Sequence, residues 1–359
     1  MRLRRWLSWV SACLFLATGC GGGGDGASEA PFTPGDLDKV APAVTYTTPL
    51  NSSTGFGTNS RLTVTFSEPM RESTLGAAIR VSDAGTGEAV AIAGVEYDLL
   101  NNLATVVPRD LLPPGRLLRA TVSTAATDLA GNALAGDYAW TFSTAGNAAG
   151  GAASGADTAA PTVSSYWPAQ GATGIALNAR IAMSFSEPMD VASVVNAFSL
   201  RAGSVQVAGR IAYVGRVAVF TPDAPLAPNA AYVATLGRAA KDLAGNALAT
   251  ELSWTFTTGA AADRSAPSVL STRPADGATN VPRDTILSVT FDEPIYPFVY
   301  GLIDGVATEV SIDYTTLTAS VTPTAPLRAS VGYAASVTTR DLAGNVSPVP
   351  YRWGFVTAP

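Results

Sequence analysis

The feature that most constrains this chain is a threefold internal repeat. Each copy opens with Ala-Pro and has a second proline seven residues later. Phe-Ser-Glu-Pro-Met, or Phe-Asp-Glu-Pro-Ile in the third copy, begins 24 residues after the first proline. Asp-Leu-Ala-Gly-Asn follows, with a tryptophan twelve residues after its aspartate. A period of about 100–120 residues is the size of a whole domain, too long for a solenoid repeat. The opening proline, phenylalanine, aspartate and tryptophan are Pro42, Phe66, Asp128 and Trp140; Pro161, Phe185, Asp242 and Trp254; Pro267, Phe291, Asp341 and Trp353.

The repeat predicts three domains joined by linkers. The ends of each copy are constant while the middle varies in length, as loop changes within one fold would produce. Small and polar residues between the copies indicate flexible connections. The predicted segments are a leader at 1–19, a tether at 20–40, a first domain at 41–144, a linker at 145–160, a second domain at 161–258, a linker at 259–265 and a third domain at 266–359.

Apolar and polar residues alternate around the landmarks, which predicts strands with one buried face. Short strands punctuated by Gly and Pro favour an all-β sandwich of about seven strands in each copy. No segment of the body shows a convincing helical period. The alternating sets are Leu62-Val64-Phe66, Ile181-Met183-Phe185 and Leu287-Val289-Phe291; Leu118-Ala120-Val122, Tyr232-Ala234-Leu236 and Tyr333-Ala335-Val337; Tyr138-Trp140-Phe142, Leu252-Trp254-Phe256 and Tyr351-Trp353-Phe355.

These marks together resemble the bacterial Ig-like domain of surface-layer and cell-surface proteins. The resemblance rests on the Ala-Pro opening, the Phe-Ser-Glu-Pro-Met strand end, Asp-Leu-Ala-Gly-Asn and the final Trp-Thr-Phe, and it covers residues 41–359. It implies three tandem Ig-like β-sandwiches. Domains of this family serve as spacers, adhesive modules or accessory domains, so the fold alone does not assign a function.

The N-terminus has the pattern of an export signal. Three arginines within the first five residues precede an apolar stretch from Trp6 to Ala17, which is too short to span a bilayer. Leu-Ala-Thr-Gly-Cys, ending at Cys20, resembles the lipobox of bacterial lipoproteins, which implies that Cys20 is lipidated and anchors the protein to a membrane. Gly21 resembles the outer-membrane sorting pattern of such proteins. The alternative is an ordinary signal peptide with an incidental cysteine.

Composition excludes several kinds of chemistry. The chain has no histidine, which excludes Ser-His-Asp catalysis and histidine metal sites. Its two cysteines, Cys13 and Cys20, both precede the body, which therefore has no disulfide or thiol nucleophile. The net charge of −6 and the two lysines make nucleic acid an unfavourable partner. We expect no cofactor, with weak calcium binding as the one exception.

Six repeated carboxylates are the candidate site residues: Glu68, Asp128, Glu187, Asp242, Glu293 and Asp341. Three interpretations are open. The fold itself can require them, since Asp closes turns on the following backbone and Gly adopts positive φ. Calcium can bind them, if Glu and Asp meet at one pole of the sandwich. A glycosidase would pair one Glu with one Asp, but three equivalent active sites in one chain would be unusual.

Tyr296, Phe298 and Tyr300 occur only in the third copy and are candidates for stacking on a ligand; otherwise they pack in the core or on a neighbouring domain. The favoured function is a non-enzymatic envelope lipoprotein whose domains form a stalk, structural or adhesion module. The alternative is a glycan- or peptide-binding envelope protein that binds its partner through the third domain. A hydrolase is disfavoured, because no catalytic set occurs once only.

Overall fold

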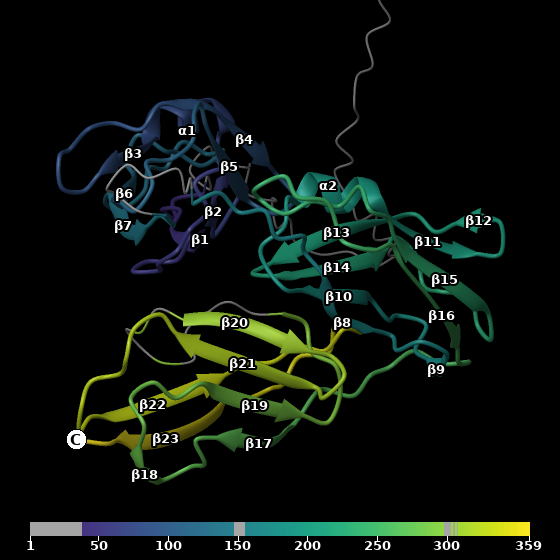
Figure 1. Cartoon of the computed structure of the whole chain (residues 1–359). Helices are drawn as coiled ribbons and strands as arrows, with labels where there is room; N and C mark the ends of the chain where they lie inside the picture. The colour runs from purple at the N-terminus through teal and green to yellow at the C-terminus, as the bar shows by residue number, and fades with distance from the viewer. Residues whose placement is uncertain (1–37, 147–154, 298–302, 304–305, 307) are drawn as a thin grey trace, which may run out of the picture. The chain divides into compact units, whose positions relative to one another are not determined.

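The alternating apolar sets lie in strands of three β-sandwiches, as predicted (Figure 1). The computed structural model describes residues 38–146, 155–297, 303, 306 and 308–359. In β2 (Leu62–Phe66), Leu62, Val64 and Phe66 are buried. Both β10 (Ile181–Phe185) and β19 (Leu287–Phe291) repeat this arrangement. Antiparallel pairing with neighbouring strands then places each set on the inner face of a sheet.

Each domain consists of two sheets. In the first domain the strand orders are β1-β2-β5-β4 and β3-β6-β7. The remaining strands of this domain are β1 (Val44–Thr48), β3 (Ile79–Asp83), β4 (Ile92–Asp98), β5 (Leu103–Pro108), β6 (Leu117–Val122) and β7 (Tyr138–Ser143).

The second domain has the orders β13-β14-β10-β8 and β12-β11-β15-β16-β9. Its strands besides β10 are β8 (Val163–Trp167), β9 (Ala172–Ile175), β11 (Phe198–Ala202), β12 (Val205–Gln206), β13 (Gly209–Val214), β14 (Val217–Pro222), β15 (Ala231–Leu236) and β16 (Leu252–Thr258).

The third domain has the orders β17-β19-β21-β20 and β18-β23-β22. Its strands besides β19 are β17 (Val269–Arg273), β18 (Ala278–Val281), β20 (Thr308–Asp313), β21 (Thr318–Pro323), β22 (Gly332–Val337) and β23 (Tyr351–Thr357). Among the named strands of the described chain, pairing is antiparallel except where β9 meets β16 and β18 meets β23.

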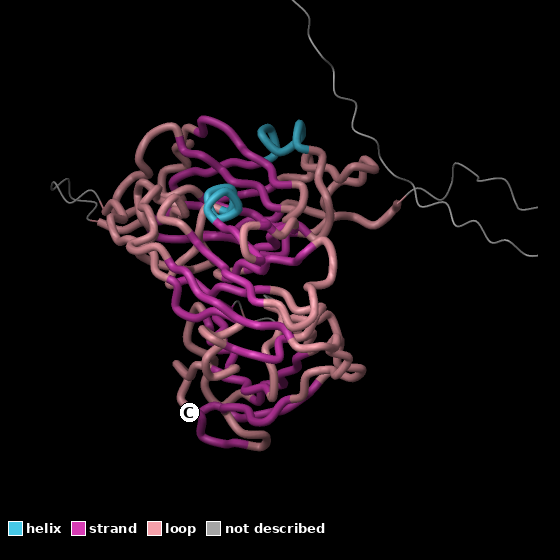
Figure 2. The backbone as a smooth tube through the Cα atoms, turned by 90° about the vertical axis from the view of Figure 1, so that its right-hand side faces the viewer, coloured by secondary structure: helices cyan, strands magenta, loops and turns pink. Residues whose placement is uncertain are grey.

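The described part of the chain also contains two short helices, for which the sequence showed no helical period (Figure 2). They are α1 (Glu72–Ala78) and α2 (Val191–Ala197), each just after the Glu-Pro landmark. Seven residues cover about two turns, too few for a 3.6-residue period to appear in the sequence. Asp190 caps α2 by accepting the Ala192 N–H at 3.2 Å. Neither helix has the length and hydropathy needed to cross a membrane in the described part of the chain.

The last strand of each domain supplies the largest core side chains, as expected for domains without a disulfide. The second and third members of each predicted trio are buried, whereas Tyr138 and Tyr351 are partly exposed and Leu252 is half-buried. The buried pairs are Trp140 and Phe142, Trp254 and Phe256, and Trp353 and Phe355.

The three sandwiches belong to one compact unit, residues 39–359. The predicted leader, the lipidation candidate Cys20, most of the tether and the aromatic candidates Phe298 and Tyr300 lie outside the described residues.

Candidate functional site

The repeated aspartate closes the turn in which it lies. In the first domain, Asp128 Oδ1 accepts the backbone N–H groups of Gly131 at 2.6 Å and Asn132 at 2.8 Å. Its Oδ2 accepts the Asn132 side-chain amide at 2.7 Å. Gly131 has a φ of +99°, a conformation that a residue with a Cβ rarely adopts. This is the local role that the Asp-Leu-Ala-Gly-Asn motif predicts.

In the other two turns the aspartate likewise accepts the backbone N–H and the side-chain amide of the turn's asparagine. Asp242 accepts from the Ala244 and Asn246 backbone N–H groups, both at 2.8 Å, and from the Asn246 amide at 2.8 Å. Asp341 accepts from the backbone and the amide of Asn345, each at 2.7 Å. All three aspartates are buried, and their carboxylate oxygens accept hydrogen bonds from the turn itself.

An isolated antiparallel β-bridge brings each strand-end glutamate close to the aspartate of the same domain. The residue two positions after the glutamate pairs antiparallel with the aspartate, as Met189 does with Asp242. The equivalent bridges join Met70 to Asp128 and Ile295 to Asp341. The carboxylate oxygens of Glu and Asp consequently lie within 4.8 Å of each other in every domain. The six sequence candidates therefore form three equivalent pairs.

The structure adds an aspartate that the sequence analysis missed. Asp157 completes a cluster with Glu187 and Asp242, and Asp263 completes one with Glu293 and Asp341, in each case within 4.8 Å. We call these two clusters the acid triads. A signal was present in the sequence, because an aspartate stands four residues before the opening proline in all three copies. In the first copy this residue is Asp38.

Burial and mutual repulsion shift the pKa values of these groups. Burial raises the pKa of Glu187 to about 7, and the charges of Asp157 and Asp242 add to the rise. Burial likewise raises the pKa of Glu293 to about 7, helped by Asp263 and Asp341.

The buried aspartates respond differently. Burial raises the pKa of Asp242 despite the opposing bonds from Asn246. At Asp128 burial alone would raise the pKa, but hydrogen bonds from the turn outweigh it and the pKa is lowered.

Such a cluster can hold a shared proton or a hard cation. Calcium takes six to eight oxygen ligands, and a triad supplies three carboxylates. Glycosidic catalysis fits less well, because each aspartate is already engaged by its own turn and each pair recurs in every domain. Calcium binding stays a prediction.

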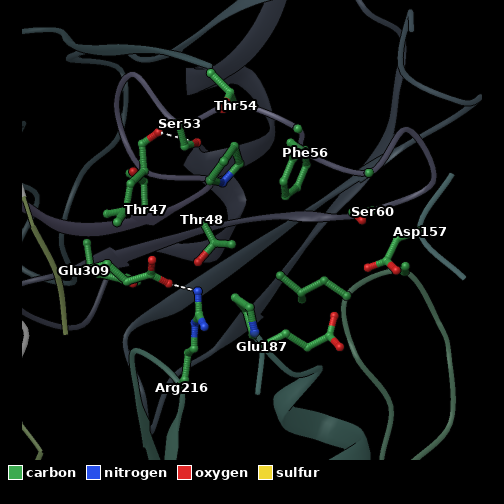
Figure 3. Close-up of a pocket in the computed structure, with 18 residues that line it drawn as sticks. Thr47, Thr48, Ser53, Thr54, Phe56, Ser60, Asp157, Glu187, Arg216 and Glu309 are labelled. Atoms are coloured by element: carbon green, nitrogen blue, oxygen red, sulfur yellow. Dashed lines mark hydrogen bonds and ion pairs between the residues drawn. The ribbon is translucent and has the colours of Figure 1, made fainter. Parts of the chain in front are cut away.

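One triad borders a pocket of about 280 Å³ (Figure 3). Asp157 and Glu187 lie on one side of it, and Arg216 forms an ion pair with Glu309 on another. The Arg216 Nη1 group also donates to the Ser186 carbonyl at 2.8 Å. The single described cation of this pocket is thus already paired with a carboxylate.

The aromatic candidate Tyr296 is half-buried and its ring contacts arginine. The Arg340 guanidinium carbon lies 4.0 Å from the ring centroid and that of Arg180 lies 5.8 Å away. Tyr296 also packs against the core of the third domain. A ligand stacking on the face beneath Arg340 would have to displace that side chain, and a role for Tyr296 in ligand binding stays a prediction.

A tyrosine that the sequence analysis missed holds the Glu-Pro segment in each domain; Tyr213 and Tyr314 are buried, and Tyr97 is half-buried. Tyr97 accepts the Met70 N–H at 2.7 Å, and Tyr213 accepts the Met189 N–H at 2.8 Å. Tyr314 instead donates to the Ile295 carbonyl at 3.2 Å. These tyrosines lie in the variable middle of the repeat, where no fixed spacing marks them.

Comparison with known proteins assigns the fold family. A family model described as the bacterial Ig-like domain matches residues 38–144, 157–258 and 263–357. The chain therefore belongs to the bacterial Ig-like domain family, with three tandem copies. No curated protein matches the sequence.

Solved structures with a similar fold have low sequence identity. The surface layer protein SbsC, domains 1–6, is 12% identical with a TM-score of 0.26, over 89% of this chain and 54% of that one. This chain thus spans about half the length of that structure. CopC from Methylosinus trichosporium OB3b is 12% identical with a TM-score of 0.24, over 29% of this chain and 93% of that one. Neither likeness carries a functional argument.

Proposed function

We propose that this protein is a non-enzymatic cell-envelope lipoprotein, anchored through Cys20, whose three Ig-like domains form a structural or adhesive module outside the cytoplasm. The observation that carries the proposal is the equivalence of the three carboxylate sites. Each repeated aspartate makes the same bonds in its own turn, and each repeated glutamate meets it through the same bridge. Because the carboxylates have the same structural role in each of the three domains, they favour a scaffold rather than an enzyme.

The anchor is supported by the Leu-Ala-Thr-Gly-Cys motif and the glycine run that follows it. Acyl chains contribute about 0.8 kcal/mol per buried CH₂, and stable anchoring requires more than one chain, as on a multiply acylated cysteine. Gly21 supports sorting to an outer membrane. Incorporation of labelled palmitate tests the anchor. We expect the label in the wild-type chain and none in a Cys20→Ser variant.

Protease treatment of intact cells tests the location, with a tag at Pro359 and lysed cells as the control. Digestion in intact cells would favour surface display and adhesion. Protection until lysis would favour a periplasmic scaffold. A soluble, unlabelled chain in the cytoplasm would contradict the proposal as a whole.

A further inference from the structure

The junctions between domains repeat as closely as the domains do. Asn59 lies in the loop before β2, and Asn178 lies in the equivalent loop before β10. Each asparagine is followed two residues later by an arginine, Arg61 or Arg180. Both loops contact the segment that leads into the following domain.

Each asparagine side chain binds both backbone polar groups of one residue in the segment that leads into the next domain. The Asn59 amide donates to the Asp157 carbonyl at 2.9 Å and accepts the Asp157 N–H at 2.7 Å. Asn178 makes the same two contacts with Asp263, at 2.9 Å and 2.8 Å. A side-chain amide offers a donor and an acceptor together, as a peptide group of a neighbouring strand does. Asparagine therefore fits this position, whereas a carboxylate has no donor for the carbonyl.

The backbone on either side adds two equivalent contacts. The Arg61 N–H donates to the Leu243 carbonyl at 3.0 Å, and the Arg180 N–H to the Leu342 carbonyl at 3.1 Å. Both leucines belong to the Asp-Leu-Ala-Gly-Asn turn of the following domain. Immediately before each asparagine, a backbone N–H donates to the approaching segment, Thr58 to Gly155 at 3.0 Å and Leu177 to Ala261 at 3.1 Å.

Burial of the accepting leucine depends on whether another domain precedes it in the described chain. Leu243 is 6% exposed and Leu342 is 3% exposed, whereas Leu129 in the first domain is 57% exposed. The loop of the third domain differs in sequence as well. Asp284 and Ile286 stand where the first two domains have Asn and Arg, and both are exposed.

We propose that the Asn-x-Arg elements, 59–61 and 178–180, latch each domain onto the next and give both junctions the same geometry. The partner that each element recognises is the start of an Ig-like domain, namely the aspartate four residues before its opening proline together with the leucine of its turn. Residues 259–263 are then held in place rather than free to hinge. Because the recognised aspartate is also a member of an acid triad, the latch sets the position of one triad carboxylate.

Trypsin cleavage after Arg264 tests the second junction in the full chain. Arg264 is exposed and follows the latched Asp263 directly, so cleavage requires the segment to open. The rate tracks the population of the open form when opening is fast. Asn178→Ala removes the two hydrogen bonds to Asp263 and a longer one, at 3.3 Å, to the Ala343 carbonyl, which predicts roughly tenfold faster cleavage at this bond. Asp284→Ala is the matched control at the equivalent position of the third domain, and its rate is expected to stay at the wild-type value.

Asn178→Asp keeps the side-chain shape and reproduces the residue of the third domain. It removes the donor and places a carboxylate near the Asp263 carbonyl, so it too is expected to accelerate cleavage. Cleavage of both Asn178 variants at the wild-type rate, with near-ultraviolet circular dichroism unchanged, would overturn the proposal. Because the rate is independent of lipidation and location, this outcome would leave the proposed function intact.

Spin labels test the first junction independently. Leu111 and Val205 are exposed and lie in the first and second domains, so they can be replaced by cysteine in a chain carrying Cys13→Ser and Cys20→Ser. We expect a narrow distance distribution in this background and a distribution at least about twice as wide after Asn59→Ala. A distance distribution of the same width before and after Asn59→Ala would contradict a latch at this junction.

Discussion

Replacing Glu187 by glutamine is expected to stabilise the second domain at neutral and alkaline pH. Glu187 shares its triad with Asp157 and Asp242, with all three carboxylates within 4.8 Å. Burial and these two charges raise the pKa of Glu187 to about 7. The ionised side chain is therefore disfavoured in the folded protein, and a neutral amide of the same shape removes the repulsion.

The sign and size of this effect follow from proton linkage. Between about pH 4.5 and pH 7 the folded state holds a proton that the unfolded state has released. The free energy of unfolding therefore falls as pH rises through this range, and the whole penalty is present above it. A rise in pKa from 4.5 to about 7 corresponds to about 3 kcal/mol at full value. Because Glu187 is partly exposed, solvent screening reduces this to about 1 to 2 kcal/mol.

Hydrogen exchange of peptides from β10 and β14 reports on the second domain by itself. We expect Glu187→Gln to raise the opening free energy of these peptides by about 1 to 2 kcal/mol near pH 8 and to leave it nearly unchanged near pH 4, where the glutamate is protonated in both the folded and the unfolded state. Glu251→Gln is the control, since it removes the same charge from an exposed site in the same domain. A loss of stability near pH 8, or a gain shared by Glu251→Gln, would refute the reasoning.

Calcium is a candidate ligand of the same site. A divalent cation relieves the repulsion that the glutamine removes, so calcium chloride is expected to stabilise the second domain near pH 8 and far less near pH 5, where protons compete. A chelator should reverse the gain, and Glu187→Gln should abolish it. No response to calcium at either pH would leave the triad as a site for protons alone.

Substitutions at three further residues test other parts of the structure. Asp128→Ala removes three hydrogen bonds from a buried turn and is expected to lower the free energy of unfolding of the first domain by about 3 kcal/mol, with a smaller loss for Asp128→Asn. Urea titration measures this loss, and a loss below about 1 kcal/mol would contradict a structural role for Asp128. Tyr213→Phe leaves the Met189 N–H without its buried acceptor, and we expect a loss of about 1 to 2 kcal/mol in the second domain by the same titration. Tyr296→Ala removes the ring beneath Arg340 and is expected to destabilise the third domain without changing binding on glycan and peptide panels. Loss of such binding in a folded variant would favour the alternative function, a glycan- or peptide-binding protein.

Spacing and alternation determined the domain fold before any contact was known. Leu62, Val64 and Phe66 could be assigned to a core because successive side chains of a strand point to opposite faces. The aspartate of Asp-Leu-Ala-Gly-Asn could be assigned to a turn because its bonds reach only a few residues along the chain. The short helix α2 could not be predicted in this way, since seven residues do not display a helical period.

The tertiary structure decided which distant residues meet. Glu187 and Asp242 lie far apart in sequence and become neighbours through the bridge from Met189, and Asp157 joins them from the segment before the domain. Asn59 looks like any loop asparagine until the backbone of Asp157, 98 residues away, supplies its donor and acceptor. Local periodicity reflects the geometry of one strand, which a short stretch of sequence encodes. Contacts between remote loops depend on how strands pair and how domains join, and no short stretch of sequence encodes that.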